Sequence, residues 1–437
     1  MTKFVCSSCG YTSVSWYGKC PQCKEWNTLK EFKELGKGRG RRGEFKEASF
    51  APLTSVQAAS HERGETGLHE FDRVIGGGFV KGEVMLIAGE PGVGKSTLLL
   101  KILEQSPALY ISGEESGQQI KQRADRLAVD LSKLHVSSDI EIAGIIQALK
   151  NSEIPFDIVV IDSIQTMFSA HIDSPMGSVA HIKEVTSRLV EYAKRSGKVV
   201  IIVGHVTKEG DIAGPKTLEH LVDCVLYLEG DKLSRFRILR AHKNRFGPTD
   251  EVGVFSMTEK GLAEVEEPSE LIESTTAQEP GRALIVSVEG SRALFYEIQS
   301  LVVPTLLTIP RRVVSGVDYN RVQLLLAVMR KYMGLKLDAY DIYVSVVGGL
   351  TAKTPAADLG IVVSILSSIE GKALQDKAAC IGEIGLLGEI RSVFGQEKVL
   401  KDVKRFGLRT IYSSKDFSSV RQLKMLLFKT SEYVEKA

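Results

Sequence analysis

Residues Gly89-Glu90-Pro91-Gly92-Val93-Gly94-Lys95-Ser96 decide the fold of this chain. They match the pattern Gly-x4-Gly-Lys-Ser/Thr in full, between an apolar run, Val84–Ala88, and a helical pattern, Ser96–Glu104. Glycines let backbone N–H groups wrap phosphates, Lys95 adds a positive charge at the β- and γ-phosphates, and the Ser96 hydroxyl suits Mg²⁺. With the adjoining Thr97, the stretch predicts a nucleotide-binding loop; a chance glycine-rich turn is the alternative.

The apolar runs around this loop predict an α/β fold. From residue 56 to about 265, short apolar strands alternate with amphipathic stretches, which is typical of βαβ units and a mostly parallel sheet. The remaining strand candidates there are Ala108–Ser112, Ile158–Ile161, Val199–Gly204, Cys224–Glu229 and Phe236–Ala241. A second pattern, which predicts another domain, consists of Arg282–Glu289, helix Asn320–Met333, strand Ile342–Val347 and helix Ala356–Ser368.

Length and composition predict a multi-domain globular protein. The chain has 437 residues, 43% of them hydrophobic, and a net charge of +2, which excludes wholesale disorder. No apolar run approaches the roughly 18–20 residues that span a bilayer, and no signal peptide is visible, so we expect a cytoplasmic protein without a membrane partner. Its expected parts are a cysteine module (1–30), a flexible basic linker (31–55), a nucleotide-binding domain (56–265), an acidic linker (266–280) and a C-terminal domain (281–437).

The small net charge conceals an asymmetry. Residues 1–50 carry ten Lys/Arg and five Asp/Glu, a net charge of +5, so the rest of the chain sums to −3. Such asymmetry indicates a local contact with nucleic acid or membrane, with a solvated linker as the alternative. Composition alone favours the solvated linker.

Four cysteines predict a metal site. Cys6, Cys9, Cys20 and Cys23 form two Cys-x2-Cys pairs, and two such knuckles complete the tetrahedral sulfur shell that suits Zn²⁺. A module of about thirty residues is too small for a self-sufficient core, so the metal would supply folding energy. Redox pairs and unrelated buried cysteines are the alternatives. The isolated Cys224 and Cys380 are expected in the core.

Carboxylates at strand ends complete the expected nucleotide site. Asp162 ends the apolar strand Ile158–Ile161, as an aspartate that holds the Mg²⁺ shell should; a helix N-cap is the alternative. Glu114 and Glu115 follow strand Ala108–Ser112 at its carboxyl end, where α/β sheets place ligands. Glu114 is our candidate for the base that activates water. A solvent-facing carboxylate at a helix start is the alternative.

Taken together, these motifs closely resemble the bacterial RadA (Sms) family. The resemblance covers nearly the whole chain and rests on the phosphate loop, the four-cysteine module and the segments Ser112–Ser116, Asp162–Thr166, Lys243–Gly247 and Pro355–Leu359. It implies a RecA-like ATPase core, an N-terminal zinc finger and a C-terminal domain shaped like the Lon protease domain. Family members are similar to hexameric helicases that drive branch migration in recombinational repair. The implied cofactors are ATP, Mg²⁺ and Zn²⁺. The implied partners are single-stranded and branched DNA, a recombinase and further copies in a homo-hexamer.

The resemblance also implies roles for individual residues. Lys243 and Arg245 match the family's Lys-Asn-Arg-Phe-Gly motif, which is thought to reach the neighbouring subunit's nucleotide, as an arginine finger does. A basic surface turn that contacts DNA phosphates is the alternative. His205 follows strand Val199–Gly204, where RecA-like proteins carry a polar γ-phosphate sensor, and a core-edge histidine is the alternative.

The expected DNA contacts lie in loops and in the last domain. In RecA-like ATPases, the loops that match Phe168–Ser178 and Lys208–Lys216 hold DNA, and the cations Lys208 and Lys216 can neutralise phosphates without contacting bases. Flexible surface loops are the alternative. Five arginines resemble basic positions of the family's Lon-like domain, with scattered solvated arginines as the alternative: Arg292, Arg311, Arg312, Arg321 and Arg391.

Two other functions fit parts of the pattern. A Lon-type protease needs a serine nucleophile and a lysine base, but Ala356 stands where the serine is required, so the retained Lys398 has no partner. The chain also departs from the family's usual Glu before Pro-Ala-Ala, with Lys353-Thr354-Pro355 there. A KaiC-like ATPase switch that binds protein partners is the second alternative, and salt-sensitive DNA binding would separate it from the DNA-dependent ATPase.

Overall fold

The structure is a computed structural model that describes residues 3–6, 11–22, 24–32, 52, 54, 63–205, 215–230, 235–266, 279–290, 292–349, 351–352, 354–401 and 407–427. It divides into two compact units, residues 1–228 with 241–249 and residues 229–240 with 250–437. Most of the two expected linkers, 31–55 and 266–280, lies outside the described residues.

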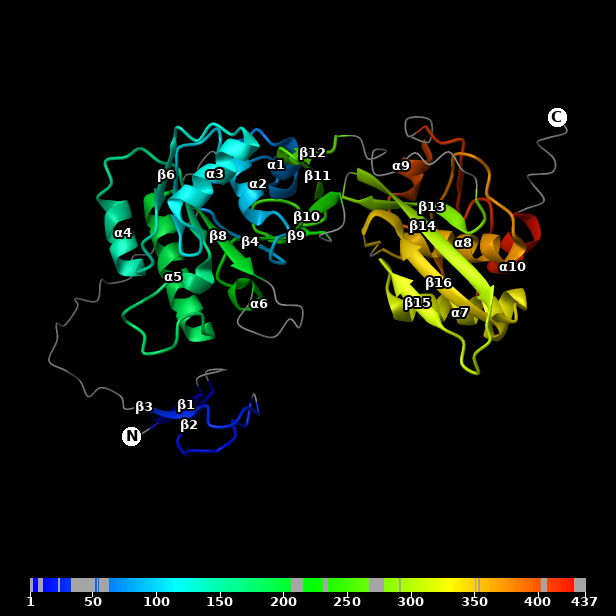
Figure 1. Cartoon of the computed structure of the whole chain (residues 1–437), viewed down its shortest axis with the longest axis horizontal. Coiled ribbons are helices and arrows are strands. Elements are labelled where there is room, and N and C mark those ends of the chain that lie inside the picture. The colour runs from blue at the N-terminus through cyan, green and yellow to red at the C-terminus, as the bar shows by residue number, and fades with distance from the viewer. Residues whose placement is uncertain are drawn as a thin grey trace. The chain divides into compact units, whose positions relative to one another are not determined.

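Six parallel strands form the centre of the first unit, in the order β9-β4-β8-β7-β5-β6 (Figure 1). Their bounds are β4 Val84–Gly89, β5 Ala108–Ser112, β6 Leu134–Ser137, β7 Ile158–Asp162, β8 Val199–His205 and β9 Cys224–Glu229. The strands β4 and β7 are buried along their whole length, as the continuous apolar runs of a sheet covered on both faces require.

Helices cover both faces of this sheet. The helices are α1 His69–Ile75, α2 Lys95–Ile102, α3 Gly117–Leu127, α4 Ile142–Lys150, α5 Val179–Ser196 and α6 Pro215–Leu218. On one face, α4 and α5 pack through Ile145 and Leu189 against strand residues such as Val159. Because neighbouring strand residues point to opposite faces, the buried Val160 faces the other side. This confirms the predicted α/β core.

The strand order determines which residues meet at the carboxyl edge of the sheet. The strand β8 lies between β4 and β7, with Gly89 opposite His205 in the register of β4 and β8. The strand β5 lies on the other side of β7, with Ser112 opposite Asp162. The ends of four strands therefore bring the phosphate loop, His205, Asp162 and the residues after Ser112 together.

The cysteine module is a small antiparallel sheet in the order β2-β1-β3, with β1 Lys3–Cys6, β2 Thr12–Ser13 and β3 Leu29–Phe32. Its core consists of Cys6, Cys20 and Leu29. So small a core agrees with the expectation that a metal contributes to its stability.

The second unit is built on a mixed sheet in the order β15-β16-β14-β13-β17-β20 (Figure 1). The strands of this sheet are β13 Arg282–Glu289, β14 Arg292–Pro304, β15 Arg312–Ser315, β16 Tyr340–Val346, β17 Ala378–Cys380 and β20 Thr410–Tyr412. The strands β18 Glu383–Ile384 and β19 Ile390–Arg391 form a separate pair. Three further strands, β10 Phe236–Asn244, β11 Val252–Thr258 and β12 Gly261–Glu264, pair antiparallel in sequence order and lie outside the mixed sheet, in the sheet that contains β9. Its helices are α7 Tyr319–Met333, α8 Asp358–Glu370, α9 Gln396–Lys401 and α10 Val420–Leu426.

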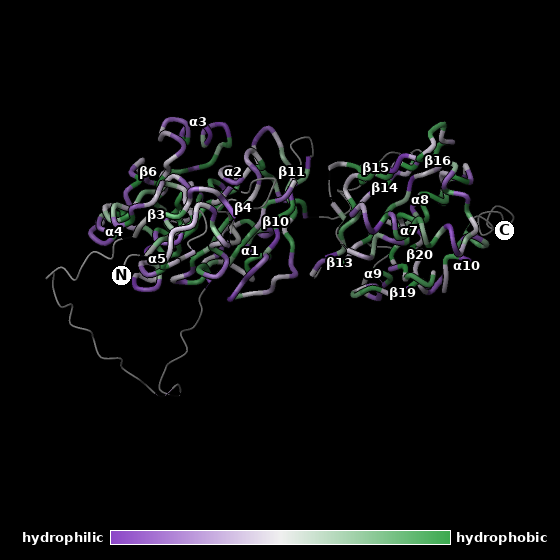
Figure 2. Tube along the Cα trace, turned by 90° about the horizontal axis from the view of Figure 1, so that it is seen from below, coloured by the Kyte–Doolittle hydropathy of each residue, from purple (hydrophilic) through white to green (hydrophobic). Residues whose placement is uncertain are grey.

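The helix α8 is the centre of this unit. Ten consecutive residues, Asp358–Ser367, are buried, and Figure 2 shows α8 in hydrophobic colours whereas the surface helix α3 is hydrophilic. The sequence pattern placed the start of this helix at Ala356, but Pro355–Ala357 forms a separate 3-10 turn. The strand β10 continues to Asn244 rather than ending at Ala241, because alternating polar side chains there weaken the strand signal.

We expect Gly360→Ala to destabilise the second unit by about 1–3 kcal/mol, because overpacking a filled core forces side chains from their rotamers. A Cβ atom at Gly360 would lie 1.8 Å from Cγ2 of Ile285. The matched control is Gly144→Ala in α4, where the nearest atom is a carboxylate oxygen of Glu141 at 3.4 Å; it should stabilise by about 0.5–1 kcal/mol. Urea unfolding followed by circular dichroism measures both changes, and equal stabilities of the two variants would contradict the packing described.

Candidate functional site

The predicted phosphate loop joins β4 to α2. Gly92 and Gly94 have φ values of 81° and 116°, which glycine adopts without strain. A Cβ atom at Gly89 would lie 2.6 Å from the carbonyl oxygen of Leu228, so this position also needs glycine. Because the first N–H groups of a helix have no partner within it, the start of α2 at Lys95 forms an anion site.

Lys95 lies deep in the loop, with 4% of its surface exposed. Its Nζ atom donates to the carbonyl oxygens of Gly89 at 2.9 Å and Glu90 at 3.1 Å. Burial lowers the pKa of Lys95, and the nearby carboxylates of Asp162 and Glu114 oppose that change. The ammonium group is therefore held where the phosphates of a nucleotide would lie.

Asp162 and Ser96 place oxygen atoms together beside Lys95. The Ser96 hydroxyl donates to Oδ2 of Asp162 at 3.1 Å, and the Tyr110 hydroxyl donates to the same oxygen. Burial raises the pKa of Asp162, whereas these two hydrogen bonds lower it. A carboxylate and a hydroxyl are hard oxygen ligands, the type that Mg²⁺ prefers, so the donor set fits the predicted ion.

Glu114, Ser163 and His205 form a second group at the same edge. The Ser163 hydroxyl donates to Oε1 of Glu114 at 2.5 Å, and Nε2 of His205 lies 3.1 Å from that oxygen. The other ring nitrogen, Nδ1, lies 3.1 Å from Nζ of Lys95. An ammonium group can only donate, so Nδ1 accepts and Nε2 carries the proton that faces Glu114. His205 thus links the phosphate-loop lysine to the candidate base.

Glu115 points away from this group. Its carboxylate receives two hydrogen bonds from the guanidinium of Arg123, at 2.5 and 2.6 Å. A bidentate pair holds both oxygens in one geometry. Of the two adjacent glutamates, Glu114 is therefore the one placed in the site. One carboxylate oxygen of Glu114, one of Asp162 and a ring nitrogen of His205 lie within 4.8 Å of one another.

Lys243 and Arg245 lie at the opposite edge of the sheet. The Nζ atom of Lys243 donates to the carbonyl oxygens of Glu219 at 2.6 Å and Val222 at 2.8 Å. Burial, followed by the charge of Arg245, lowers the pKa of Lys243. Arg245 is 57% exposed and pairs with Oδ1 of Asp223 at 3.3 Å.

Asp223 anchors this edge. It is 4% exposed, and its Oδ2 atom accepts from Nζ of Lys194 at 2.6 Å and from the N–H of Val84, the first residue of β4, at 3.0 Å. The phosphate loop begins at the other end of β4. At about 3.3 Å per residue, the six residues of β4 separate Asp223 from the start of the phosphate loop by roughly 16–20 Å. Arg245 therefore cannot contact a nucleotide bound in the loop of its own chain.

The rest of the Lys243–Gly247 motif packs against the loop after α1. The Nδ2 atom of Asn244 donates to the carbonyl oxygen of Ile75 at 3.2 Å, and Arg63 donates to that of Phe246. A Cβ atom at Gly247 would lie 3.0 Å from the oxygen of Ile75 and 3.1 Å from Cα of Gly76. Glycine at 247 allows this close approach of two backbones.

The predicted DNA-binding loops are only partly described. Phe168–Ser178 lies beyond β7 at the carboxyl edge, with Phe168 37% and Met176 52% exposed. Lys208 and the side chain of Lys216 lie outside the described residues.

The five arginines predicted to contact DNA have different surroundings. Arg311 is exposed, and Arg391 is 63% exposed beside Glu389. Arg312 donates to the carbonyl oxygens of Tyr340 and Leu337, and Arg321 pairs with the buried Asp358.

Arg292 differs from the others because it is 7% exposed and donates to the carbonyl oxygens of Val265 and Glu266. Its guanidinium holds the chain end of the preceding segment, and its expected contact with DNA stays a prediction.

Two similar turns of the cysteine module begin at Cys6 and Cys20. Cys6 and Cys20 are buried, and their N–H groups donate to the carbonyl oxygens of Tyr11 and Glu25, both at 2.8 Å, closing two similar turns. These paired turns fit two thiolate knuckles around Zn²⁺. Cys9 and Cys23 lie outside the described residues. Cys224 and Cys380 are fully buried, as expected.

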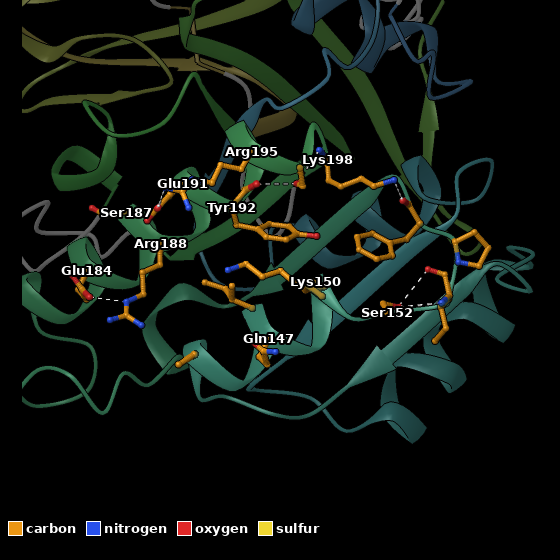
Figure 3. A pocket seen from close by; sticks show the side chains of 17 residues that line it. Gln147, Lys150, Ser152, Glu184, Ser187, Arg188, Glu191, Tyr192, Arg195 and Lys198 are labelled. Carbon is orange, nitrogen blue, oxygen red and sulfur yellow. Dashed lines mark hydrogen bonds and ion pairs between the residues drawn. The ribbon is translucent and has the colours of Figure 1, made fainter. Parts of the chain in front are cut away.

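A surface cavity of about 830 Å³ lies apart from the predicted site. It is lined by residues of α4, α5 and the segments that follow them, and none of the predicted site residues lines it (Figure 3). Two of its cations, Arg188 and Arg195, pair with Glu184 and Glu191 one helical turn away.

In the described residues, no helix is long and apolar enough to cross a membrane.

Three protein families match separate parts of the chain. The rubredoxin metal-binding domain matches residues 4–31, the KaiC ATPase family matches residues 64–154, and the C-terminal proteolytic domain of Lon protease (S16) matches residues 323–423. These matches confirm the predicted fold class, a RecA-like P-loop core between a zinc-type module and a Lon-like domain.

Relatives match the chain over nearly its whole length. The DNA repair protein RadA of Bacillus subtilis (strain 168) is 46% identical over 419 residues, 93% of this chain and 91% of that protein. The chain belongs to the RadA family. RadA of Aquifex aeolicus (strain VF5) is 44% identical over 422 residues, 93% of this chain and 92% of its own. The solved RadB recombinase aligns with 46% of this chain and 99% of its own, at 24% identity and a TM-score of 0.38.

Several residues that build this RadA-family site were not predicted from the sequence. Tyr110 and Ser163 bind the two central carboxylates, and Asp223 and Arg63 hold the Lys243–Gly247 motif. A polar signal exists for Tyr110 and Asp223, because each interrupts or flanks an apolar run. The role of Arg63 has no local sequence signal, because Arg63 donates to a main-chain carbonyl oxygen far along the chain, that of Phe246.

We expect Tyr110→Phe to raise the pKa of Asp162, because it removes a hydrogen bond that favours the carboxylate. The protonated acid is a poorer ligand, so the acid limb of Mg²⁺-dependent ATP binding should move to higher pH. Binding of a fluorescent ATP analogue across pH measures the shift. Tyr192→Phe, in the cavity of Figure 3, should leave the acid limb unchanged, and an unshifted limb in Tyr110→Phe would refute the coupling.

Proposed function

We propose that this chain is a DNA-dependent ATPase of recombinational DNA repair, acting in the cytoplasm as a homo-hexameric ring that moves on single-stranded and branched DNA and promotes branch migration with a recombinase partner. One observation carries the proposal: Lys95, Asp162 and Glu114 converge at one edge of the sheet, while Arg245 lies at the other. The names of its relatives, DNA repair protein RadA, support the DNA substrate.

At the nucleotide edge, the backbone of Gly89–Thr97 would hold the ATP phosphates and Lys95 would neutralise the β- and γ-phosphates. Ser96 and Asp162 would hold Mg²⁺, which would neutralise the charge that develops on the phosphates. Glu114 would accept the proton of the attacking water. Ser163 and His205 orient its carboxylate, and His205 would also sense the γ-phosphate through its contact with Lys95.

At the other edge, Arg245 would complete the site of a neighbouring copy, with Lys243 beside it. The length of β4 supports this assignment, because it keeps Arg245 from the nucleotide of its own chain. Hydrolysis would then depend on assembly, and DNA in the ring could control it. The loops Phe168–Ser178 and Lys208–Lys216 are the proposed DNA contacts of the core, and Arg311 and Arg391 those of the Lon-like domain, where their exposure supports the role.

A KaiC-like switch is the second candidate, since the KaiC ATPase family matches residues 64–154. It would bind protein partners and hydrolyse ATP to time their release. Phosphate contacts weaken steeply with salt, so salt-insensitive or absent DNA binding would favour the switch. We propose that the Lon-like domain lacks protease activity, because Ala356 has no nucleophilic atom and is 3% exposed.

Single-stranded DNA should raise the steady-state rate of ATP hydrolysis by the wild-type chain. Lys95→Ala should lose hydrolysis with or without DNA, because the cation that neutralises the phosphates is removed. Lys101→Ala, in the last turn of α2, is the matched control and should retain the stimulated rate. Full activity of Lys95→Ala, or no response of the wild type to DNA, would refute the proposal.

Mixing two inactive variants tests action between neighbours. Arg245→Ala should lower hydrolysis by about 10³-fold or more, as loss of an arginine finger does. In an equimolar mixture of Arg245→Ala and Lys95→Ala, about one site in four would combine an intact loop with an intact Arg245 from its neighbour. About a quarter of the wild-type rate should therefore return after the subunits exchange. A mixture as inactive as its components would exclude this arrangement.

A further inference from the structure

The cysteine module exposes its aromatic side chains. Trp16, Tyr17 and Trp26 are 55%, 46% and 70% exposed, although aromatic residues usually provide the core of a small module. The core of this one consists instead of Cys6, Cys20 and Leu29. Clustered exposed aromatic surface, unlike scattered apolar residues, marks a binding site.

The two indole rings both lie beside Gly18 and are held by hydrogen bonds of the main chain and of Trp16. Lys19 and Trp26 pair as a β-bridge, and the N–H of Asn27 donates to the carbonyl oxygen of Gly18 at 2.7 Å. The ring nitrogen of Trp16 donates to the carbonyl oxygen of Leu29 at 3.0 Å. A Cβ atom at Gly18 would lie 3.5 Å from the ring of Trp16 and 3.8 Å from that of Trp26. Glycine therefore leaves open the space next to both rings.

Positive charge accompanies the rings. The Nζ atom of Lys19 lies 5.5 Å from the centre of the Trp26 ring, and the exposed Lys24 follows in the next turn, beside Glu25. Residues 1–50 as a whole carry a net charge of +5. Aromatic faces with neighbouring cations are the combination that binds single-stranded nucleic acid, because bases stack on the rings while cations neutralise phosphates.

We infer that Trp16 and Trp26, with Lys19, form a binding site for single-stranded DNA, at which unpaired bases stack on the indole rings. The choice of DNA as the ligand rests on the proposed function. Paired bases in a duplex are already stacked on one another, so the site would distinguish single strands from duplex. It would hold the displaced or unpaired strand of a branched substrate by a contact separate from the ATPase core, without sequence preference.

Trp16 and Trp26 are the two tryptophans of the whole chain, so tryptophan fluorescence reports on this module alone. The experiment titrates the full-length zinc-loaded protein with oligothymidylate of about 16 nucleotides. Stacking should quench the tryptophan emission, and duplex DNA of equal length should quench it far less. Unquenched emission at an oligonucleotide concentration that saturates DNA-stimulated ATP hydrolysis would overturn the inference.

Substitutions test whether the rings supply affinity. Trp26→Ala should weaken binding of labelled oligothymidylate by about 5- to 100-fold, and Trp26→Phe should restore most of it, since loss of one base–aromatic stack has this effect. Lys19→Gln should weaken binding and reduce its salt dependence. Phe394→Ala, another exposed aromatic residue at 86%, is the matched control. Zinc content shows that the variants of the cysteine module retain its fold, and circular dichroism does so for Phe394→Ala.

The outcomes separate this inference from the proposed function. If DNA stimulates ATP hydrolysis but Trp26→Ala binds single strands as the wild type does, the inference is wrong, while the proposed function stands. If oligothymidylate quenches the tryptophans but does not stimulate hydrolysis, the DNA-dependent ATPase is wrong and the stacking site stands.

Discussion

The strand β4 constrains the arrangement of the whole site. Its carboxyl end delivers the phosphate loop, and its first N–H group is bound by Asp223, which also holds Arg245. Because a buried parallel strand is rigid and its length is set by residue count, one chain holds the phosphate loop and Arg245 about one strand length apart. In the proposed assembly, Arg245 would therefore act on the nucleotide of a second copy.

The position of β8 between β4 and β7 adds a second constraint. It separates the phosphate loop from Asp162 by one strand, and His205 at the end of β8 lies in the resulting space. Lys95, Asp162 and Glu114 are close enough for each charge to affect the pKa of the lysine. In a site of low dielectric, such charges interact more strongly than in water.

Most strands of the parallel sheet could be predicted from the sequence, and so could Lys95, Asp162 and Glu114 as candidate site residues. Buried parallel strands are continuous apolar runs, so β4, β5, β7, β8 and β9 could be located within one or two residues. Strand order is not encoded locally, and the contact of His205 with both Lys95 and Glu114 follows from it. Glu114 and Glu115 differ only in the direction of their side chains, which Arg123 decides. The burial of Arg292 depends on carbonyl groups about 26 residues away in the chain, beyond the reach of any local pattern.

The contact between Gly247 and Gly76 restricts the lengths of the two turns that meet there. Where two backbones touch directly, no side chain between them can adopt another rotamer to compensate for a shift. An insertion or deletion in either turn would therefore displace Arg245 from Asp223. The Lys243–Gly247 motif therefore combines two separate tasks. In the proposed assembly, Lys243 and Arg245 would act on a neighbouring copy, whereas Asn244 and Gly247 hold the turn against Ile75 and Gly76 of their own chain.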